Sequence, residues 1–418
     1  MMKLLFSPVV VTAFSLAGSL LAGLYVPSAN AVVQEIRAEF VPDPTNPMLN
    51  KFKNTTPQTG VCPQWISAVC ERMGIFSLAV PGLRFNSSKP ILANHADPRQ
   101  GAIFSVPSSW RSLEVVHSRT GERETVQVRV AGIGGTWDMA RPPGVSAWSQ
   151  GGYWFYQWRN APAPCSGVPV GVAGVAHSPF FWLVPEGEGG CGRVPSVDIP
   201  WFNFNSVSYV YELRTPNPLG MSSGEYKGSL TYMTGPGMDF DMGDVLLPND
   251  PAITLNFTLD VMHALKVEIP PGGHRIELVP QGGWQAWLNQ GRKPVRLFRD
   301  QAFNVSASSR FKMLLECQYS AGNTCALRDS GSPHLVPLNT SVTLPSGLTD
   351  ASGQAVDRRP LRLDGSGTEL FQPGYYVERR PGNLHFEVAR EHVEQMLQDG
   401  NGKTYSGDVT VIWDSEVI

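Results

Sequence analysis

Charged side chains are scarce in this sequence. They make up 17% of its 418 residues, against roughly 25% in an average soluble protein. This shortage excludes a coiled coil, a helical bundle and a charge-rich disordered chain. The net charge of −3 excludes a strong basic field for nucleic acid. Glycine (42) and proline (35) are abundant instead, which is typical of a globular protein whose many short elements are joined by turns.

Motifs that carry enzyme chemistry are also missing. The sequence has no Gly-x-Ser-x-Gly elbow, no His-Glu-x-x-His pair, no P-loop and no dinucleotide fingerprint. Asp239, Asp241 and Asp244 resemble part of a calcium loop, but the other ligands of such a loop are absent. Glu186 and Glu188 could serve a glycosidase, but their glycine-rich surroundings favour a surface loop. We therefore expect no catalytic residue, no metal site and no cofactor.

The first 31 residues have the composition of an export signal. Lys3 precedes a mostly apolar run at residues 4–26, and Ala29 and Ala31 form the small-x-small pattern that signal peptidase requires. A retained membrane anchor is the weaker alternative, because Ser, Gly and Pro interrupt the run. No later segment is long and apolar enough to span a bilayer. We expect residues 1–31 to be removed on export and the mature chain to begin near Val32.

All six cysteines follow this signal. An even number in an exported chain favours three disulfides over a metal site or a catalytic thiol. No Cys-x-x-Cys pair or nearby histidine supplies the spacing of a zinc site. Six cysteines allow fifteen pairings. We predict that neighbours pair, because each pair brackets a turn-rich stretch: Cys62 with Cys70, Cys165 with Cys191, and Cys317 with Cys325.

Short β-branched or alternating segments dominate the rest of the chain. The predicted strands are residues 125–130, 207–213, 253–261, 264–269, 275–279 and 383–388. The one convincing helix is predicted at residues 388–398, where Val393, Met396 and Leu397 share one side and Gly400 follows. Many short strands bounded by turn residues predict an all-β protein made of β-sandwiches.

One short pattern occurs twice. Residues 226–232 and 405–411 share Tyr-x-Gly-x-aliphatic-Thr, and both follow a polar, glycine-containing turn. Any amphipathic strand alternates in this way, but the shared Tyr, Gly and Thr favour a true repeat. We interpret the two copies as the terminal strands of two sandwich domains joined by a linker at residues 247–251. The predicted domains are residues 32–249 and 250–418.

The C-terminal segment resembles the last strand of subunits that the bacterial chaperone–usher pathway assembles. That segment, residues 405–418, ends an exported, disulfide-bearing, strand-rich chain. Residues 211–216 and 235–243 are similar to minor subunits and adhesin-like proteins of those fimbriae, as are residues 40–47 and 54–57. The resemblance covers the signal, the overall size and both domain ends.

This resemblance implies two immunoglobulin-like, pilin-like β-sandwich domains, of which the C-terminal one is incomplete. A donor strand from a periplasmic pilus chaperone, and later from a neighbouring pilin subunit, would complete it, because an unpaired edge over an open core aggregates. The residues expected to face that partner are Tyr405, Gly407, Val409, Val411 and Trp413. An outer-membrane usher is a further implied partner, and the implied location is the fimbrium at the bacterial cell surface.

Tryptophan is concentrated in the N-terminal domain, where we expect a receptor-binding surface. Aromatic rings stack on the apolar face of a sugar while polar neighbours hold its hydroxyls. The candidate ligand-binding residues are Trp137, Asp138, Trp148, Trp154 and Trp158. Core packing is the commoner role for any single tryptophan. Trp137 and Trp148 are the better surface candidates, because adjacent glycine pairs predict turns.

Together these features predict a fimbrial tip or minor subunit that mediates cell adhesion. Residues 32–249 would be an adhesin-like domain that binds a host glycan or surface protein, and residues 250–418 would anchor it in the fibre. The alternative is a non-adhesive subunit that initiates or terminates pilus assembly, and a secreted carbohydrate-active enzyme is more distant. Residues 35–40 also alternate and could be a donor strand. In that case the subunit would lie inside the fibre.

Overall fold

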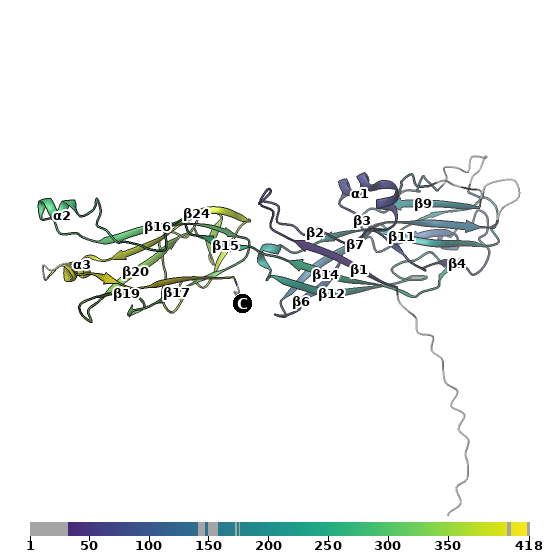
Figure 1. The fold of residues 1–418 in the computed structure, drawn as a ribbon. Coiled ribbons are helices and arrows are strands. Elements are labelled where there is room, and N and C mark those ends of the chain that lie inside the picture. Colours follow the sequence, from purple (N-terminus) through teal and green to yellow (C-terminus); the bar gives the residue numbers. More distant parts are fainter. Residues whose placement is uncertain are drawn as a thin grey trace, which may run out of the picture. The chain divides into compact units, whose positions relative to one another are not determined.

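The structure is a computed structural model that describes residues 32–140, 147–148, 158–171, 174, 176–398 and 403–415. The predicted export signal at residues 1–31 lies outside this range. Within the described residues the chain is almost entirely β, as the sequence predicted, and its helices are short (Figure 1). No helix among the described residues is long and apolar enough to cross a membrane.

The first sandwich spans residues 32–261 and is organised around a twelve-stranded sheet. The main path of this sheet runs β13 (Leu246–Pro248), β4 (Phe85–Ser87), β11 (Phe202–Arg214), β7 (Arg123–Met139), β6 (Arg111–His117), β12 (Gly224–Met233), β14 (Ala252–Val261), β1 (Val32–Phe40) and β2 (Lys53–Asn54). Joined to it are β3 (Phe76–Val80), β8 (Ser166–Gly167) and β9 (His177–Leu183), while β5 (Ala102–Ser105) pairs with β10 (Gly190–Arg193). Helix α1 (Ser67–Met73) follows a short π-helical turn at Cys62–Ile66, and two 3-10 turns lie at Pro98–Gln100 and Pro218–Gly220.

Strand β14 is enclosed by two neighbours. β1 runs parallel to it, from Val32 opposite Ile253 to Phe40 opposite Val261, and β12 runs antiparallel on its other edge. Every second side chain of β1 faces the core, and Ile36 is 1% exposed. Alternation with a period of two is what a strand with one buried face requires. The first core is therefore closed on both edges of β14.

The position of β14 corrects the predicted domain boundary. The sequence placed residues 253–261 at the start of the second domain, but their buried side chains belong to the first core. The proline-rich segment at residues 248–251 only turns the chain between β13 and β14 of one sheet, and the first sandwich ends at Val261. β12 is likewise not a terminal strand, because it lies between β6 and β14. Proline and aspartate mark a turn, but they do not say whether the next strand joins the same sheet.

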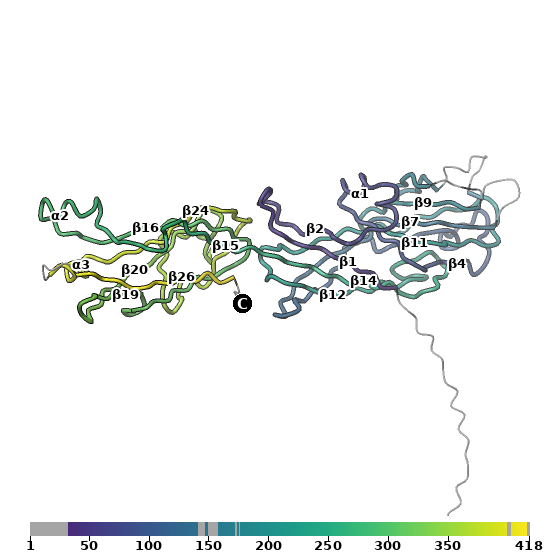
Figure 2. The backbone as a smooth tube through the Cα atoms, viewed as in Figure 1, coloured from purple at the N-terminus to yellow at the C-terminus, as the bar shows by residue number. Residues whose placement is uncertain are grey.

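The second sandwich has one larger sheet and two small two-stranded sheets around a separate core. The larger sheet runs β15 (Leu265–Glu268), β16 (Leu297–Ala307), β24 (Val377–Val388), β20 (Leu335–Thr343), β19 (Thr324–Asp329) and β18 (Ser320–Ala321), with β22 (Arg359–Pro360) on β20 and β25 (Tyr405–Ser406) on β19. The smaller sheets pair β17 (Lys312–Cys317) with β26 (Val409–Asp414), and β21 (Leu348–Asp350) with β23 (Phe371–Pro373). The backbone trace shows β16, β24 and β20 running side by side (Figure 2). The larger sheet and both small sheets contribute side chains to one hydrophobic cluster.

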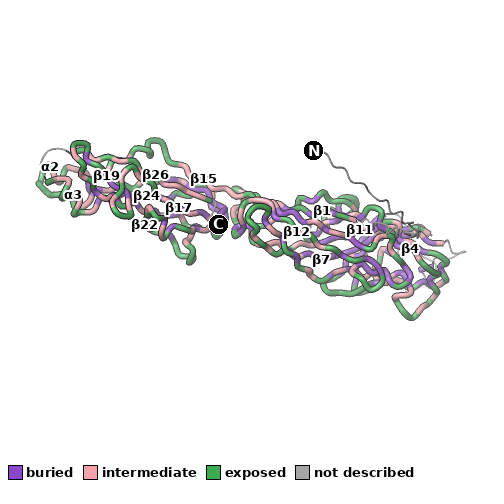
Figure 3. The backbone as a smooth tube through the Cα atoms, turned by 90° about the horizontal axis from the view of Figure 1, so that it is seen from below, coloured by how far each residue is buried: buried purple, intermediate pink, exposed green. Residues whose placement is uncertain are grey.

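Burial separates strands from loops in both sandwiches. The buried stretches lie mostly in the strands, and exposed stretches lie in the connections (Figure 3). Helix α3 (Arg390–Met396) confirms the predicted helix in a shorter form, with Val393 buried against the second core. The prediction of a strand at residues 275–279 is wrong, because in that segment only Val279 makes a β-bridge, to Phe298. Pro280 and two glycines follow it and stop a ladder from forming before α2 (Gln285–Gln290).

Three disulfides have the pairing that the sequence predicted. Cys62 pairs with Cys70, Cys165 with Cys191, and Cys317 with Cys325. Their sequence separations of 8, 26 and 8 residues make each of them a local link. The sandwiches themselves are held by strand ladders and by their two cores.

Candidate functional site

The tryptophans predicted to bind a ligand are core residues. Trp137, Trp148 and Trp158 are 2%, 6% and 3% exposed and belong to the first hydrophobic cluster. Their rings meet with centroids 5.2 to 6.1 Å apart, in tilted or edge-to-face arrangements that aromatic pairs prefer. Side chains buried to this extent have no face to offer a sugar. Trp154, the remaining tryptophan of the prediction, lies outside the described residues.

The glycines beside Trp137 explain this error. The sequence pattern predicts a turn at Gly134 and Gly135, but both lie within β7, between β9 and β11. A Cβ atom on Gly135 would stand 1.9 Å from the carbonyl oxygen of Ser206. Glycine is needed there because two backbones approach closely, which is its other use besides turns. The strand therefore continues and carries Trp137 into the core.

Asp138 is the one described candidate that remains at the surface of the first sandwich. Its side chain points away from Trp137 because successive side chains of a strand alternate. One carboxylate oxygen contacts Nδ1 of His177, and the other accepts a hydrogen bond from the amide of Asn205. These three residues come from β7, β9 and the paired strand β11. They form a small polar surface cluster.

The C-terminal strand has the alternation that the sequence predicted. Tyr405, Gly407, Val409, Val411 and Trp413 are each partly buried, and the residues between them up to Thr410 are exposed. The last three of these inward residues pack against the second core. No residue of β26 is fully buried, although the strand is largely apolar. The inward face of β26 therefore covers the core while remaining partly open to solvent.

Only one edge of β26 carries a ladder among the described residues. The strand pairs antiparallel with β17 along its whole length. Just before it, the backbone N–H of Gln318 donates to the carbonyl oxygen of Asp408 at 2.9 Å. Hydrogen-bonded positions alternate along an antiparallel ladder, so every second residue after Asp408 also bonds to β17. The backbone groups of Val409, Val411 and Trp413 therefore point to the opposite edge, where no described strand pairs with them.

The C-terminal end of β26 is fixed by side-chain contacts. The ring of Trp413 lies 5.0 Å from that of Phe303 and 5.6 Å from that of Phe311, between centroids. Lys312 Nζ lies 3.1 Å from a carboxylate oxygen of Asp414 across the ladder. Such a half-exposed ion pair contributes little stability, on the order of 1 kcal/mol or less. Ring packing and the β17 ladder hold the strand in place, so its open edge is a defined template.

A second partly open element contributes to the same core. β15 pairs with β16 on one edge only, and among the described strands none lies on its other edge. Its inward residues Leu265 and Val267 are partly buried and pack against the second core, as do Ile276 and Leu278 further along the chain. β15 and β26 do not pair with each other. Among the described strands, the second core is thus bounded by two that each have an unpaired edge, and the sequence pattern did not predict the open edge of β15.

The segment that could be a donor strand is already paired within the first sandwich. Residues 35–40 belong to β1, whose backbone pairs with β14 and whose inward side chains lie in the first core. Among the described residues, no cluster of histidine, cysteine and acidic side chains could hold a metal ion. Asp239, Asp241 and Asp244 bind arginine instead, with Arg99 Nη1 2.7 Å from Asp241 Oδ2 and Arg111 Nη2 2.6 Å from Asp239 Oδ1. Positive partners of this kind leave these carboxylates poor candidates for calcium.

Comparisons with known proteins agree with this architecture only loosely. No family model matches the chain, and no curated protein matches its sequence. A chaperone–tip adhesin complex of CFA/I fimbriae matches at 9% identity and TM-score 0.24, covering 93% of this chain and 97% of that chain. CfaE, the adhesive subunit of CFA/I fimbria of enterotoxigenic Escherichia coli, matches at 10% identity and TM-score 0.24, covering 92% of each chain.

A third structure is of another fimbrial type. It is the CsuC–CsuE chaperone–tip adhesion subunit pre-assembly complex from archaic chaperone–usher Csu pili of Acinetobacter baumannii. It matches at 9% identity and TM-score 0.22, covering 92% of this chain and 98% of that chain. TM-scores this low carry no argument about function. The function has to be argued from the strands of the chain itself.

Proposed function

We propose that this chain is a tip or minor subunit of a chaperone–usher fimbrium and accepts a partner strand at the open edge of β26. The observation that carries the proposal is the state of β26. Its apolar face covers the second core, yet Val409, Val411 and Trp413 are only partly buried and direct their backbone groups to an edge where no described strand pairs with them. An added strand would pair with that edge and cover those side chains in one step.

Physical chemistry supports a partner over a permanently open edge. Unpaired N–H and C=O groups above exposed apolar side chains form a template for aggregation. Proteins that tolerate such edges blunt them with charges, proline or bulges. The inward positions of β26 carry Val409, Val411 and Trp413 instead. A periplasmic chaperone and then a neighbouring pilin subunit are the partners we propose, with an outer-membrane usher and a final location in the fimbrium at the cell surface.

The state of β1 supports a position at the tip. A subunit inside a fibre must both accept a strand and give one away. The segment at residues 35–40 pairs with β14 and fills the first core with Ile36, Ala38 and Phe40. Giving it away would open that core. We infer that the chain accepts a strand and keeps this one, as a subunit at an end of the fibre would.

Adhesion is the role we propose for the first sandwich. It is larger than the second, and strand complementation does not require it. A non-adhesive assembly subunit is the second candidate, because the described ligand candidates other than Asp138 are core residues. Screening the chaperone-bound full chain against glycans and matrix proteins separates the two. Specific binding supports the adhesin, and no binding to any of them supports the assembly subunit.

Co-expression tests the strand-accepting role. The full chain is produced in a bacterial periplasm with and without a pilus chaperone, and soluble protein is measured by size-exclusion chromatography. We expect a stable complex of the two proteins in high yield. Without the chaperone most of the chain should be degraded or aggregated, with a small soluble fraction. Equal yields of soluble chain with and without the chaperone would contradict the proposal.

Two variants of β26 make this test specific. Val411→Asp puts a charge on the inward face, where a partner strand would bury it, and burying an unpaired charge is costly. Thr410→Asp puts the same charge on the exposed face of the same strand. We expect the first to abolish the complex and the second to leave it intact. Equal yields of complex from the two variants would show that the inward face of β26 is not the contact.

A further inference from the structure

Helix α2 of the second sandwich buries none of its side chains. It spans the six residues Gln285–Gln290, and none of them is buried. An isolated helix shorter than about 12 residues is marginal in water, so packing against a neighbour normally stabilises a helix this short. Helix α3, at the same end of the sandwich, has such packing, because its Val393 is 0% exposed (Figure 1). Helix α2 has no comparable contact within the part of the chain that the structure describes.

Three apolar side chains lie together at this helix. Trp284, the residue before the helix, packs partly against the second core. Trp287 lies beside it, with ring centroids 5.8 Å apart. Leu288 is 73% exposed, the highest value for any large apolar side chain among the described residues. One exposed apolar side chain is ordinary at a protein surface, but an aromatic pair with an exposed leucine next to it needs an explanation.

Backbone turns on both sides hold this helix. Gly291 ends it with φ of 66°, and its N–H donates to the carbonyl oxygens of Ala286 and Trp287. Before the helix, the N–H of Gly283 donates to the carbonyl oxygen of Pro280 at 2.9 Å, and Gly283 has φ of 78°. Glycine adopts this left-handed conformation without strain. The turns therefore keep the helix in place although its side chains are exposed.

Positive charge is concentrated in the same segment. Residues 270–299 contain five lysine and arginine residues and one acidic residue, Glu277, although the whole chain has a net charge of −3. Arg292 and Lys293 follow the turn that ends α2, and both are exposed. Neither of them has a carboxylate partner among the described residues. Unpaired positive charge therefore lies directly beside the exposed apolar side chains.

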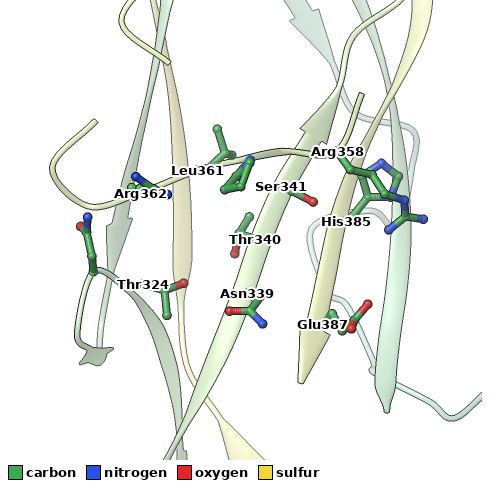
Figure 4. A pocket seen from close by; sticks show the side chains of 11 residues that line it. Thr324, Asn339, Thr340, Ser341, Arg358, Leu361, Arg362, His385 and Glu387 are labelled. Carbon is green, nitrogen blue, oxygen red and sulfur yellow. The ribbon is translucent and has the colours of Figure 1, made fainter. Parts of the chain in front are cut away.

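Charged side chains at the polar cavity beside β20 show the contrast. Arg358, His385 and Glu387 are among the residues that line this cavity (Figure 4). Glu387 Oε2 accepts a hydrogen bond from Arg296 Nη1 at 3.1 Å, and His385 Nδ1 lies 2.7 Å from Asp300 Oδ1. Arg358 Nη2 lies 3.8 Å from the other oxygen of Asp300. These charges have neighbours of opposite sign within the sandwich, and those of Arg292 and Lys293 do not.

We propose that the α2 tip, residues 284–295, docks on an anionic phospholipid bilayer. Trp287 and Leu288 enter the boundary between headgroups and acyl chains, where tryptophan is enriched in membrane proteins. Arg292 and Lys293 stay at the headgroups, and basic residues near an anionic leaflet strengthen binding to it. A bilayer suits both features, because its apolar interior lies directly beneath its negative surface. The tip shares no residue with β26, so this docking does not depend on strand acceptance.

Co-sedimentation with vesicles tests the proposal. The soluble full chain is mixed with vesicles of phosphatidylcholine alone or of phosphatidylcholine with phosphatidylglycerol, and any chaperone that co-purifies is measured alone as a blank. We expect at least about tenfold tighter binding to the anionic vesicles, and weaker binding in added salt, which screens exposed charges. Glycerol phosphate, a soluble headgroup, should not compete at constant ionic strength. Equal binding to the two kinds of vesicle, or full displacement by glycerol phosphate, would overturn the proposal.

Charge reversal tests the role of the two basic residues. The double variant Arg292→Glu, Lys293→Glu should bind anionic vesicles about tenfold or more weakly, because it replaces attraction to the headgroups by repulsion. The double variant Lys51→Glu, Lys53→Glu is the matched control, since it makes the same change in net charge on exposed lysines of the first sandwich. It should bind much as the unchanged chain does. Equal losses in the two double variants would contradict a contact through the α2 tip.

Leu288→Asp tests insertion into the apolar layer. Because Leu288 is mostly exposed, the thermal unfolding midpoint should stay the same, while binding to anionic vesicles should weaken about tenfold or more. Leu92→Asp is the control, since Leu92 is 60% exposed in the first sandwich and should not affect vesicle binding. If both leucine variants bind equally well while the Arg292 and Lys293 reversal abolishes binding, the contact is purely electrostatic. That result would fit an acidic protein surface, and the bilayer proposal would be wrong.

Discussion

The two copies of Tyr-x-Gly-x-aliphatic-Thr share a sequence pattern but differ in burial and in strand pairing. In β12, Tyr226 and Tyr232 are 0% and 1% exposed, because β14 pairs along the whole strand and β1 closes the sheet beyond it. In the C-terminal copy, Tyr405 and Val411 are only partly buried, and β26 has one partner. The two strand sequences are thus equally suited to burial, but among the described residues the C-terminal copy has a paired strand on one edge only.

The repeated glycine has the same cause in both copies. A Cβ atom on Gly228 would stand 2.3 Å from the carbonyl oxygen of Glu114 in β6, and one on Gly407 would stand 2.9 Å from that of Ala326 in β19. In each case the strand passes close to the backbone of its neighbour, which only glycine permits. The repeat therefore indicates local packing of one strand against another. It does not indicate which strand ends a domain.

Truncation should give the largest contrast between the two sandwiches. A fragment of residues 32–262 keeps β14 and its contacts with β1 and β12, so we expect it to be soluble and folded. A fragment of residues 32–245 lacks β14, which opens both neighbours and the core, so we expect aggregation. Circular dichroism and size-exclusion chromatography distinguish the outcomes. A folded shorter fragment would mean that β14 is dispensable to the first core.

Removing a core side chain of β1 should lower the free energy of unfolding by less than the loss of a whole strand does, but by a large amount. Ile36→Ala removes a side chain that is 1% exposed, and such core changes cost about 2–5 kcal/mol of unfolding free energy. Val33→Ala on the same strand is the control, because Val33 is 56% exposed and should change stability by about 0.5 kcal/mol or less. Urea unfolding measures both. Similar losses in the two variants would argue against β1 as part of the core.

The corresponding change in β26 should be small until a partner binds. Val411 is partly buried, so Val411→Ala removes about 1 kcal/mol from the isolated chain. A partner strand would complete its burial, so the same variant should bind that partner several-fold more weakly. Thr410→Ala, on the exposed face, should change neither quantity. The comparison fails if Val411→Ala costs as much in the isolated chain as Ile36→Ala does.

The smallest effect is expected from lowering the pH, through one carboxylate of the second sandwich. The pKa of Asp364 is lowered to about 2, chiefly because it accepts the backbone N–H of Ser366, and then by the Asn323 side chain. A carboxylate whose pKa is lower in the folded state stabilises it above the unfolded value near 4 and loses that effect as the pH falls toward 2. Thermal unfolding at pH 5 and pH 2.5 should therefore show a smaller acid loss for Asp364→Asn than for the unchanged chain. An equal loss of stability in both proteins would show that Asp364 does not contribute to the acid sensitivity.

The sequence predicted what depends on local pattern. Alternation identified an all-β chain and the inward face of the C-terminal strand, and turn-rich spacing identified the three disulfides. It placed Trp137 on a turn, because nothing local distinguishes a glycine required by close backbones from a glycine required by a turn. It also assigned β14 to the wrong sandwich, since pairing with β1 joins residues more than 200 positions apart.

Hydrogen exchange along β26 tests the open edge most directly. The measurement is made residue by residue on the isolated full chain. We predict fast exchange of the amides of Val409, Val411 and Trp413, which face the open edge, and slower exchange of Thr410 and Ile412, which bond to β17. A strand-supplying partner should slow the first group and leave the second unchanged. Uniformly slow exchange of all these amides in the isolated chain would contradict the claim that β26 awaits a partner.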